Sequence, residues 1–337
     1  MKLAFDELIA NVCALLPTYF PVIEQCAAQV YCTLLSFATP DMRLRQVYDR
    51  TFNLPFFVSF SSSLPGVNSL AYSADGKHVA SGLLDGFISM WDPDADSATI
   101  LPIITWQAHS KAVLAIAFSP DGTTIVSASS DGTLKVWDTE TKSLEISLDL
   151  PSERTTMKRT ESRASLTFSA TGTLVAFTSP YSRKIWSTKT WKEERFDGPG
   201  YNVTNGGHWI ALSPDTSCFA VADGYGIYVF DLDGLHYIVR NRKSHRHLLF
   251  STDGTLIRST HGTYDVVTNE QVESRHHRSQ FSEDLYVDQG WLIDKDGHKR
   301  CWIPEAHREG DFYAAHRNKI VFAGNDQLTF LKLGTMP

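Results

Sequence analysis

Short hydrophobic runs alternate with turn-forming polar residues along most of the chain, and two stretches of this pattern are copies of each other. Residues 67–92 and 113–138 superpose at a constant offset of 46 positions. The offset aligns Asp75-Gly76, Asp85-Gly86 and Trp91-Asp92 with Asp121-Gly122, Asp131-Gly132 and Trp137-Asp138. Asp-Gly provides the positive φ of tight two-residue turns between antiparallel strands. Each copy is therefore predicted to be a meander of short strands.

The strands themselves carry apolar residues on both faces. The run from Val113 to Phe118 reads VLAIAF, whereas a strand with one face in water alternates apolar and polar residues. Both faces of each small sheet must therefore be covered. Sheets stacked face to face in a ring would satisfy this requirement.

Weaker copies of the unit follow the first two. They occupy residues 165–187, 210–231, 248–267 and 284–303. The copy at 248–267 keeps Asp253-Gly254 but is interpreted as having lost the aromatic-Asp ending. Residues 29–48 are interpreted as a degenerate first unit. Together the units favour seven sheets, with six as the alternative.

The residues before Gln29 follow another pattern. Their apolar side chains recur at helical spacing up to Pro17, at Leu8, Ile9, Val12, Leu15 and Leu16. No linker rich in Gly, Ser or Pro divides the rest of the chain. We therefore expect a helical segment at 1–28 and one repeat domain at 29–337.

One unit resembles the WD-repeat family in detail. His109, Val113, the run from Phe118 to Gly122 and the pair Trp137-Asp138 match the pattern of that family. The resemblance implies an all-β fold, a seven-bladed or six-bladed β-propeller preceded here by the short helix. In that family each repeat forms one four-stranded blade, and an offset between repeat and blade joins the two ends of the chain.

The same resemblance implies a tetrad of hydrogen-bonded side chains. The tetrad consists of His109, Ser127, Asp131 and Trp137. In such a set the Asp caps its own turn, the His bridges Asp and Ser, and the Trp supplies buried area and a donor. The other well-kept unit, in which Ser63 stands where the His would be, implies only a partial tetrad of Ser81, Asp85 and Trp91.

A narrower resemblance covers the flanks of the repeats. Residues 29–48, 290–308 and 316–324 are similar to the flanks of the propeller in fungal NACHT and WD-repeat proteins. Those proteins belong to the STAND class of signal-transducing NTPases, in which the repeats are thought to sense a ligand. The chain contains no Gly-x-x-x-x-Gly-Lys-Ser/Thr loop. The resemblance therefore covers only the sensor part, and it does not imply NTP hydrolysis.

The composition of the chain limits the classes of partner that we expect it to bind. The formal net charge is -7 and the pI is near 5.9, so we expect proteins as partners and no nucleic acid. The five cysteines include no Cys-x-x-Cys pair, and neither a cofactor nor a metal is expected. Asp6 and Glu7 interrupt the apolar stretch near Met1, and no run is long enough to span a bilayer. These features predict a cytoplasmic protein without membrane contact, and they leave its oligomeric state open.

Several residues could carry chemistry, but a structural interpretation is favoured for each. His109, Ser127 and Asp131 are the residue types of a catalytic triad, yet no Gly-x-Ser-x-Gly elbow occurs. Asp92, Asp94 and Asp96 alternate as in a calcium loop, but Ile103 stands where Glu is needed. The histidine pairs, His245 with His247 and His276 with His277, lack the cysteine or helical partners expected of a zinc site. The basic run at 240–247 could meet an acidic partner or phosphate, but it is interpreted as a loop with exposed charge.

These observations favour a non-catalytic scaffold or ligand-sensing module. Loops at one rim of the propeller would bind the partner, and the family pattern places Leu84, Lys111 and Ser130 there. One alternative is a hydrolase acting in the central channel, which needs two titratable groups together in that channel. Another is a degenerate fragment of a larger NACHT and WD-repeat protein.

Overall fold

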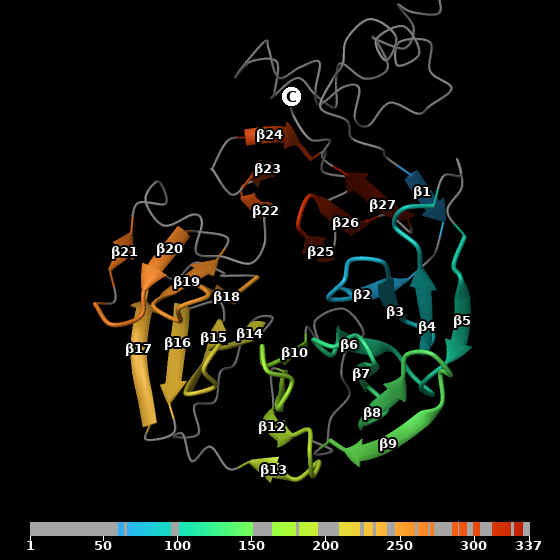
Figure 1. Cartoon of the computed structure of the whole chain (residues 1–337), viewed down its shortest axis with the longest axis horizontal. Helices are drawn as coiled ribbons and strands as arrows, with labels where there is room; N and C mark the ends of the chain where they lie inside the picture. Colours follow the sequence, from blue (N-terminus) through green and yellow to red (C-terminus); the bar gives the residue numbers. More distant parts are fainter. Residues whose placement is uncertain are drawn as a thin grey trace, which may run out of the picture. The chain divides into compact units, whose positions relative to one another are not determined.

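The described part of the chain consists of short β-strands joined by turns (Figure 1). The computed structural model describes residues 60–63, 66–95, 101–150, 164–179, 182–194, 209–222, 226–231, 234–240, 247–259, 262–268, 270–272, 285–288, 290–294, 299–303, 312–324 and 327–332. The described residues fall into two compact units, of which unit 2 comprises those within 66–93 and 102–282 and unit 1 comprises the others. No described segment is a helix long and apolar enough to cross a membrane.

Unit 2 contains five antiparallel sheets of four strands, called blades 1 to 5 in chain order. Blade 1 is β2 (Val67–Tyr72), β3 (Val79–Leu83), β4 (Phe87–Trp91) and β5 (Ile104–Gln107); blade 2 is β6 (Val113–Phe118), β7 (Thr124–Ser129), β8 (Thr133–Asp138) and β9 (Leu144–Asp149). Blade 3 is β10 (Ser165–Phe168), β11 (Leu174–Thr178), β12 (Arg183–Ser187) and β13 (Glu193–Glu194). Blade 4 is β14 (Trp209–Leu212), β15 (Cys218–Ala222), β16 (Gly226–Asp231) and β17 (Gly234–Arg240); blade 5 is β18 (Leu249–Phe250), β19 (Leu256–Ser259), β20 (Gly262–Asp265) and β21 (Gln271–Val272).

Unit 1 contains two further sheets. Blade 6 is β22 (Leu285–Asp288), β23 (Trp291–Asp294) and β24 (Lys299–Trp302); blade 7 is β25 (Phe312–His316), β26 (Lys319–Gly324), β27 (Gln327–Lys332) and β1 (Phe60–Ser63). The first described strand thus pairs with the last, in the register of Phe60 opposite Phe330. The first and last described strands therefore lie in one sheet, as the offset between repeat and blade implies.

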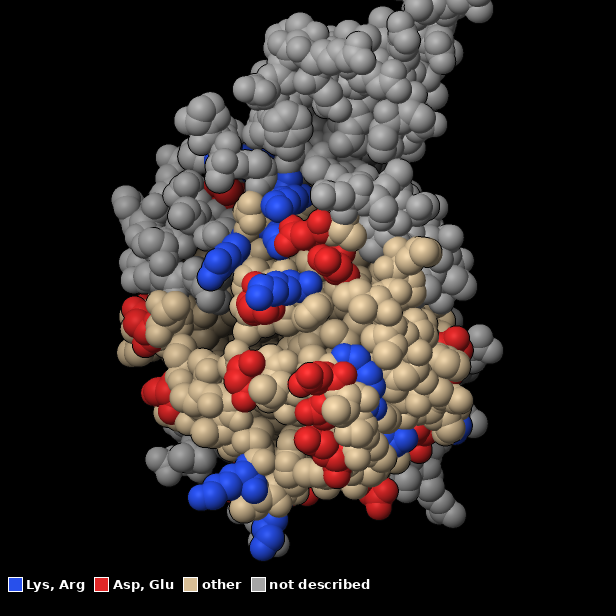
Figure 2. All heavy atoms as spheres, turned by 45° about the vertical axis from the view of Figure 1, so that its right-hand side comes forward, with Lys and Arg blue, Asp and Glu red and all other residues tan. Residues whose placement is uncertain are grey.

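The strands of a blade differ in burial according to their position. The innermost strands of successive blades in unit 2 contact one another, from β2 and β6 through β10 and β14 to β18. In blade 2 every residue of β6 is buried, while the outermost strand β9 is half exposed. Figure 2, in which the side with β5 and β9 comes forward, shows charged side chains on this outer surface. The predicted cover on both faces of Val113–Phe118 is confirmed.

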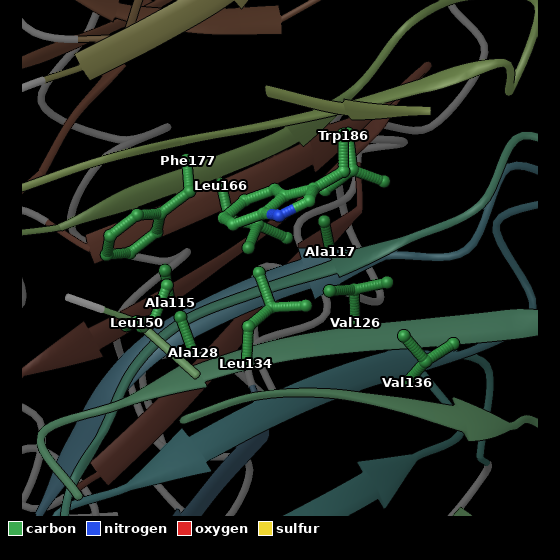
Figure 3. Packing of buried hydrophobic residues seen from close by; sticks show 11 residues of the cluster. Ala115, Ala117, Val126, Ala128, Leu134, Val136, Leu150, Leu166, Phe177 and Trp186 are labelled. Atoms are coloured by element: carbon green, nitrogen blue, oxygen red, sulfur yellow. The ribbon is translucent and has the colours of Figure 1, made fainter. Parts of the chain in front are cut away.

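The hydrophobic core lies between neighbouring blades. Figure 3 shows the layer between blades 2 and 3, where Leu166, Phe177 and Trp186 face small side chains of blade 2 such as Ala115 and Ala117. Large side chains of one sheet placed against alanines of the next allow the two sheets to pack closely. Similar clusters lie between blades 1 and 2, 3 and 4, and 4 and 5 in unit 2, and between blades 6 and 7 in unit 1.

The first turns of blades 1 to 5 share one design, which differs from the predicted two-residue turn. The closing hydrogen bond runs from the Ser73 amide to the His78 carbonyl (2.9 Å), so four residues form the loop. Within it the Ser73 hydroxyl donates to the Asp75 carboxylate (2.7 Å) and lowers the pKa of that carboxyl. The turn serines are Ser73, Ser119, Ser169, Ser213 and Ser251, and all are buried. The predicted length is wrong because a β-turn is followed here by a left-handed residue, such as Gly76 (φ +69°).

One interpretation of the weaker repeats needs correction. Tyr264-Asp265 occupies the Trp-Asp position of blade 5, because Tyr264 lies opposite Ile257 as Trp137 lies opposite Ile125. The aromatic-Asp ending at 248–267 is therefore present. It escaped the pattern because the second hairpin is shorter there, with Ser259 opposite Gly262.

The seventh sheet comes from the carboxy-terminal residues 312–332 together with 60–63. The suggested first unit at 29–48 and the helical segment at 1–28 lie outside the described residues. Within the described residues, six sheets have four strands and one has three. The fold is an all-β propeller, as the sequence predicted.

Candidate functional site

The four side chains of the tetrad contact one another in blade 2. Ser127 lies on β7, Trp137 on β8 and Asp131 in the turn between them, while His109 precedes β6. His109 Nε2 is 2.8 Å from Ser127 Oγ, and His109 Nδ1 is 3.1 Å from Asp131 Oδ2. Trp137 Nε1 donates to Ser127 Oγ over 2.9 Å. The chain thereby links the start of the blade, its middle strands and one turn.

The charges of the tetrad fix the direction of these hydrogen bonds. Burial lowers the pKa of His109 below 6.5, although Asp131 opposes that effect. Burial alone would raise the pKa of Asp131, but hydrogen bonds from Thr133 and Ser110 outweigh it and the pKa is lowered. A neutral imidazole beside a carboxylate carries its proton on Nδ1 and donates it to Asp131. Its Nε2 therefore accepts the hydroxyl proton of Ser127.

Hydrogen bonds in a catalytic Ser-His-Asp triad run in the same direction, from Ser to His to Asp. Whether a substrate can reach the Ser127 hydroxyl therefore decides between catalysis and a structural role. Ser127 is 0% exposed, and its oxygen already accepts the indole N–H of Trp137. The His109 side chain is likewise fully buried. A nucleophile must reach the carbonyl carbon of a substrate, and this hydroxyl reaches only its two partners. The geometry supports a structural tetrad.

The tetrad also connects blade 2 to blade 1. The His109 amide donates to the Gly86 carbonyl in the second turn of blade 1 (3.0 Å). The Trp137 ring packs edge to face against Trp106 of β5, with ring centroids 6.2 Å apart. Lys135 Nζ lies 5.7 Å from the centre of the Trp137 ring. Two neighbouring blades are therefore held together at this point by hydrogen bonds and aromatic packing.

The partial tetrad of blade 1 is assembled only in part. Trp91 Nε1 donates to Ser81 Oγ over 2.9 Å, and both residues are fully buried. Asp85 is exposed and accepts the Phe87 amide (3.2 Å). Ser63 belongs to β1 of unit 1. Where a histidine would bridge Asp and Ser, Asp85 caps its own turn and the Ser81 hydroxyl donates to the Ser89 carbonyl (3.4 Å).

Residues next to the tetrad were missed by the sequence reasoning. Thr133 donates its hydroxyl to Asp131 Oδ1 over 2.6 Å, and the Ser110 amide donates to Asp131 Oδ2 over 3.1 Å. A Thr two positions after an Asp in a turn is a signal for such a bond. Ser110 gives no such signal, since its contact depends on how the preceding segment approaches the turn.

The state of His109 predicts acid sensitivity. In the unfolded chain its imidazole titrates near about 6.5, whereas the folded pKa is lower. Below about pH 6.5 the unfolded chain thus binds a proton that the folded chain does not, and stability falls as pH falls, by up to about 1.4 kcal/mol per pH unit. Thermal unfolding between pH 7.5 and pH 5.5 should show a smaller loss of Tm for His109→Gln than for the wild type. An equal loss in both proteins would contradict this assignment.

The three predicted rim residues lie at one end of blades 1 and 2. Leu84 is 45% exposed, and its amide donates to the Gly66 carbonyl (2.8 Å). Lys111 is exposed, and its carbonyl accepts the Ser129 hydroxyl (3.1 Å). The Ser130 amide donates to the Ala112 carbonyl (3.0 Å). These bonds fix the turns that carry the exposed side chains of Leu84 and Lys111 and the half-buried Ser130.

The described aspartates and histidines that were considered as metal ligands do not lie together in one site. Asp94 contacts Lys319 and Lys332 of blade 7 in unit 1, and Asp96 lies outside the described residues. His247 packs against Trp209 with ring centroids 4.2 Å apart, whereas His245, His276, His277 and residues 241–246 are not described. Within the described ranges, no group of three or more His, Cys, Asp or Glu side chains is arranged to hold a metal ion.

Comparison with known families supports the architecture. The model for the WD domain, G-beta repeat, matches residues 57–92 and 101–138. These ranges contain most of blades 1 and 2, including all four tetrad residues. A comparison with curated proteins gave no match. The chain is therefore a β-propeller protein that contains WD repeats.

Proposed function

We propose that this chain is a non-catalytic protein-interaction module whose partner binds the end of blades 1 and 2 that carries Leu84, Lys111 and Ser130. One observation carries the proposal. An apolar and a cationic side chain, Leu84 and Lys111, are both exposed on turns whose backbones lie close together.

The closeness of these turns follows from the backbone. A Cβ at Gly86, in the turn of Leu84, would lie 2.8 Å from the Lys111 carbonyl oxygen. The Gly86 carbonyl in turn accepts the amides of Ala108 and His109. Because the turns are ordered before a partner arrives, binding would cost little conformational entropy. Propellers with WD repeats commonly act as scaffolds for protein interactions, which agrees with this use of the surface.

Further parts of the proposal rest on sequence alone. The relation to the sensor part of fungal STAND proteins rests on the flanking segments 29–48, 290–308 and 316–324. Cytoplasmic location and the division into 1–28 and 29–337 rest on composition and hydrophobic pattern. Location can be measured by imaging a tagged full chain.

The test compares capture by variants at the two ends of blade 1. Wild-type chain, a Leu84→Asp/Lys111→Glu double variant and a Lys77→Glu control are used as baits in native lysate. Lys77 is exposed in the first turn, at the other end of β3. We expect a protein retained by wild type and control to be reduced at least about tenfold by the double variant, as hot-spot residues would require.

Circular dichroism and Tm must agree among the three baits, so that loss of folding is not mistaken for loss of binding. Equal capture of every partner by all three proteins would reject this surface as the interaction site.

A further inference from the structure

The outermost strand of blade 1 is an edge without charge. Strand β5 pairs with β4 on one side and ends the sheet. Its residues Ile104, Thr105, Trp106 and Gln107 are all uncharged, and Ile103 before it is 56% exposed. Isoleucine and threonine are strong strand formers. An exposed, uncharged edge of this kind can accept a further strand.

The outermost strands of blades 2 and 3 carry charged residues that discourage pairing with another chain, whereas β5 carries none. Strand β9 of blade 2 carries exposed Glu145 and Asp149, and β13 of blade 3 consists of exposed Glu193 and Glu194. Charged side chains on an edge discourage pairing with another chain. The contrast makes β5 the edge in blades 1 to 3 that is open to strand addition.

The outward backbone groups of β5 follow from its pairing. The Ala108 amide donates to Gly86 on the neighbouring strand's side (3.1 Å). The Ile103 amide also donates to β4, at the Met90 carbonyl (2.7 Å), so the regular alternation is interrupted before Ile104. From Ile104 to Gln107 the register against Met90 to Phe87 has no shift, and the pair of Ala108 and Gly86 continues it. Since amides alternate in direction along a regular strand, the N–H groups of Trp106 and Ile104 point toward β4 as that of Ala108 does. The N–H and C=O groups of Thr105 and Gln107 therefore point away from the sheet, toward an added strand.

The charged residues around β5 indicate which charge an added strand should carry. Lys142, in the turn from Asp138 to Ser143, lies 5.9 Å from the centre of the Trp106 ring. This turn and the start of β9 carry Asp138, Glu140 and Glu145 against Lys142 alone. Figure 2 shows Asp and Glu side chains gathered beside a broad uncharged area on this side of the molecule.

We propose that the β5 edge is a docking site for an extended basic peptide of a partner protein, which pairs as a fifth strand of blade 1. Side chains of residues directly opposite each other in a sheet lie on the same face. Peptide side chains opposite Ile104 and Trp106 thus lie near the turn from Asp138 to Ser143, whose acidic residues favour Lys or Arg at these positions. At the peptide positions between them we expect β-branched residues, which are strong strand formers. Main-chain hydrogen bonds supply the affinity. The net charge of -7 on the whole chain favours a cationic partner over a second copy.

The probe is a fluorescein-labelled peptide of three Lys-Val repeats, titrated against the full chain by fluorescence anisotropy. The key variant is Thr105→Pro, which removes one outward N–H and leaves the bonds to β4; proline is tolerated at such edge positions. Its matched control is Thr105→Val, which loses the same hydroxyl bond to Ser89 (2.8 Å) but keeps the N–H. We expect binding to fall at least about tenfold in Thr105→Pro and to stay within about threefold in Thr105→Val.

The proposal would be overturned if the wild type did not bind the probe, if Thr105→Pro and Thr105→Val bound it equally, or if a Glu-Val peptide bound as tightly as the Lys-Val peptide. A wild-type dimer in sedimentation velocity that Thr105→Pro converts to a monomer would identify a second copy as the occupant, and would also overturn it. Leu84→Asp should bind the probe as the wild type does, so that this test and the test of the rim surface can fail separately.

Discussion

Replacing Trp137 with alanine lowers the free energy of unfolding by about 3–5 kcal/mol, the usual cost of deleting a large buried aromatic side chain. Trp137 is 5% exposed, and it packs in the cluster between blades 1 and 2. The change also leaves Ser127 without the indole donor and removes the edge-to-face contact with Trp106. Urea denaturation followed by circular dichroism measures the loss.

A phenylalanine series separates the hydrogen bond from the buried area. Trp137→Phe keeps a ring but removes the N–H that Ser127 accepts, and should cost about 1–3 kcal/mol. Trp106→Phe is the matched control, because the buried Nε1 of Trp106 has no hydrogen-bond partner among the described residues. It should therefore cost less than Trp137→Phe. Equal costs for the two phenylalanine variants would mean that the tetrad bond contributes nothing.

The repeat pattern allowed the fold class to be predicted because it reports local chemistry. An Asp-Gly pair fixes a turn within a few residues, and a Trp-Asp ending marks the third strand of a blade. Where a hairpin is shortened, as before Tyr264, the same residues move out of the expected spacing. Sequence reasoning then overlooks a residue that strand pairing places without ambiguity.

Long-range pairing explains what the sequence left open. Nothing local in Phe60–Ser63 indicates that its partner is Gln327–Lys332, more than two hundred residues away. The tetrad could be predicted from the family pattern, since its members lie within one repeat. Contacts between blades, such as Gly86 against His109, depend on how two repeats stack. No sequence pattern within either repeat predicts them.

Gly86→Ala tests that stacking, and should lower the free energy of unfolding by about 2–5 kcal/mol. Gly86 has a φ of +91°, a left-handed conformation that costs alanine about 1–2 kcal/mol. In addition, a Cβ at this position would lie 2.3 Å from the His109 carbonyl oxygen. That oxygen belongs to the backbone, so the segment carrying the tetrad histidine would have to move away from blade 1.

Gly132→Ala is the control for backbone strain alone, because Gly132 holds the same turn position in blade 2 with a φ of +88° and a Cβ there would meet no atom within 4 Å. It should cost only the left-handed conformation, about 1–2 kcal/mol. The excess cost of Gly86→Ala, measured by urea denaturation under identical conditions, is the contribution of close contact between blades 1 and 2. If the two alanine variants were equally stable, the approach of His109 to Gly86 would be looser than the structure shows, and the fixed rim on which partner binding depends would lose its basis.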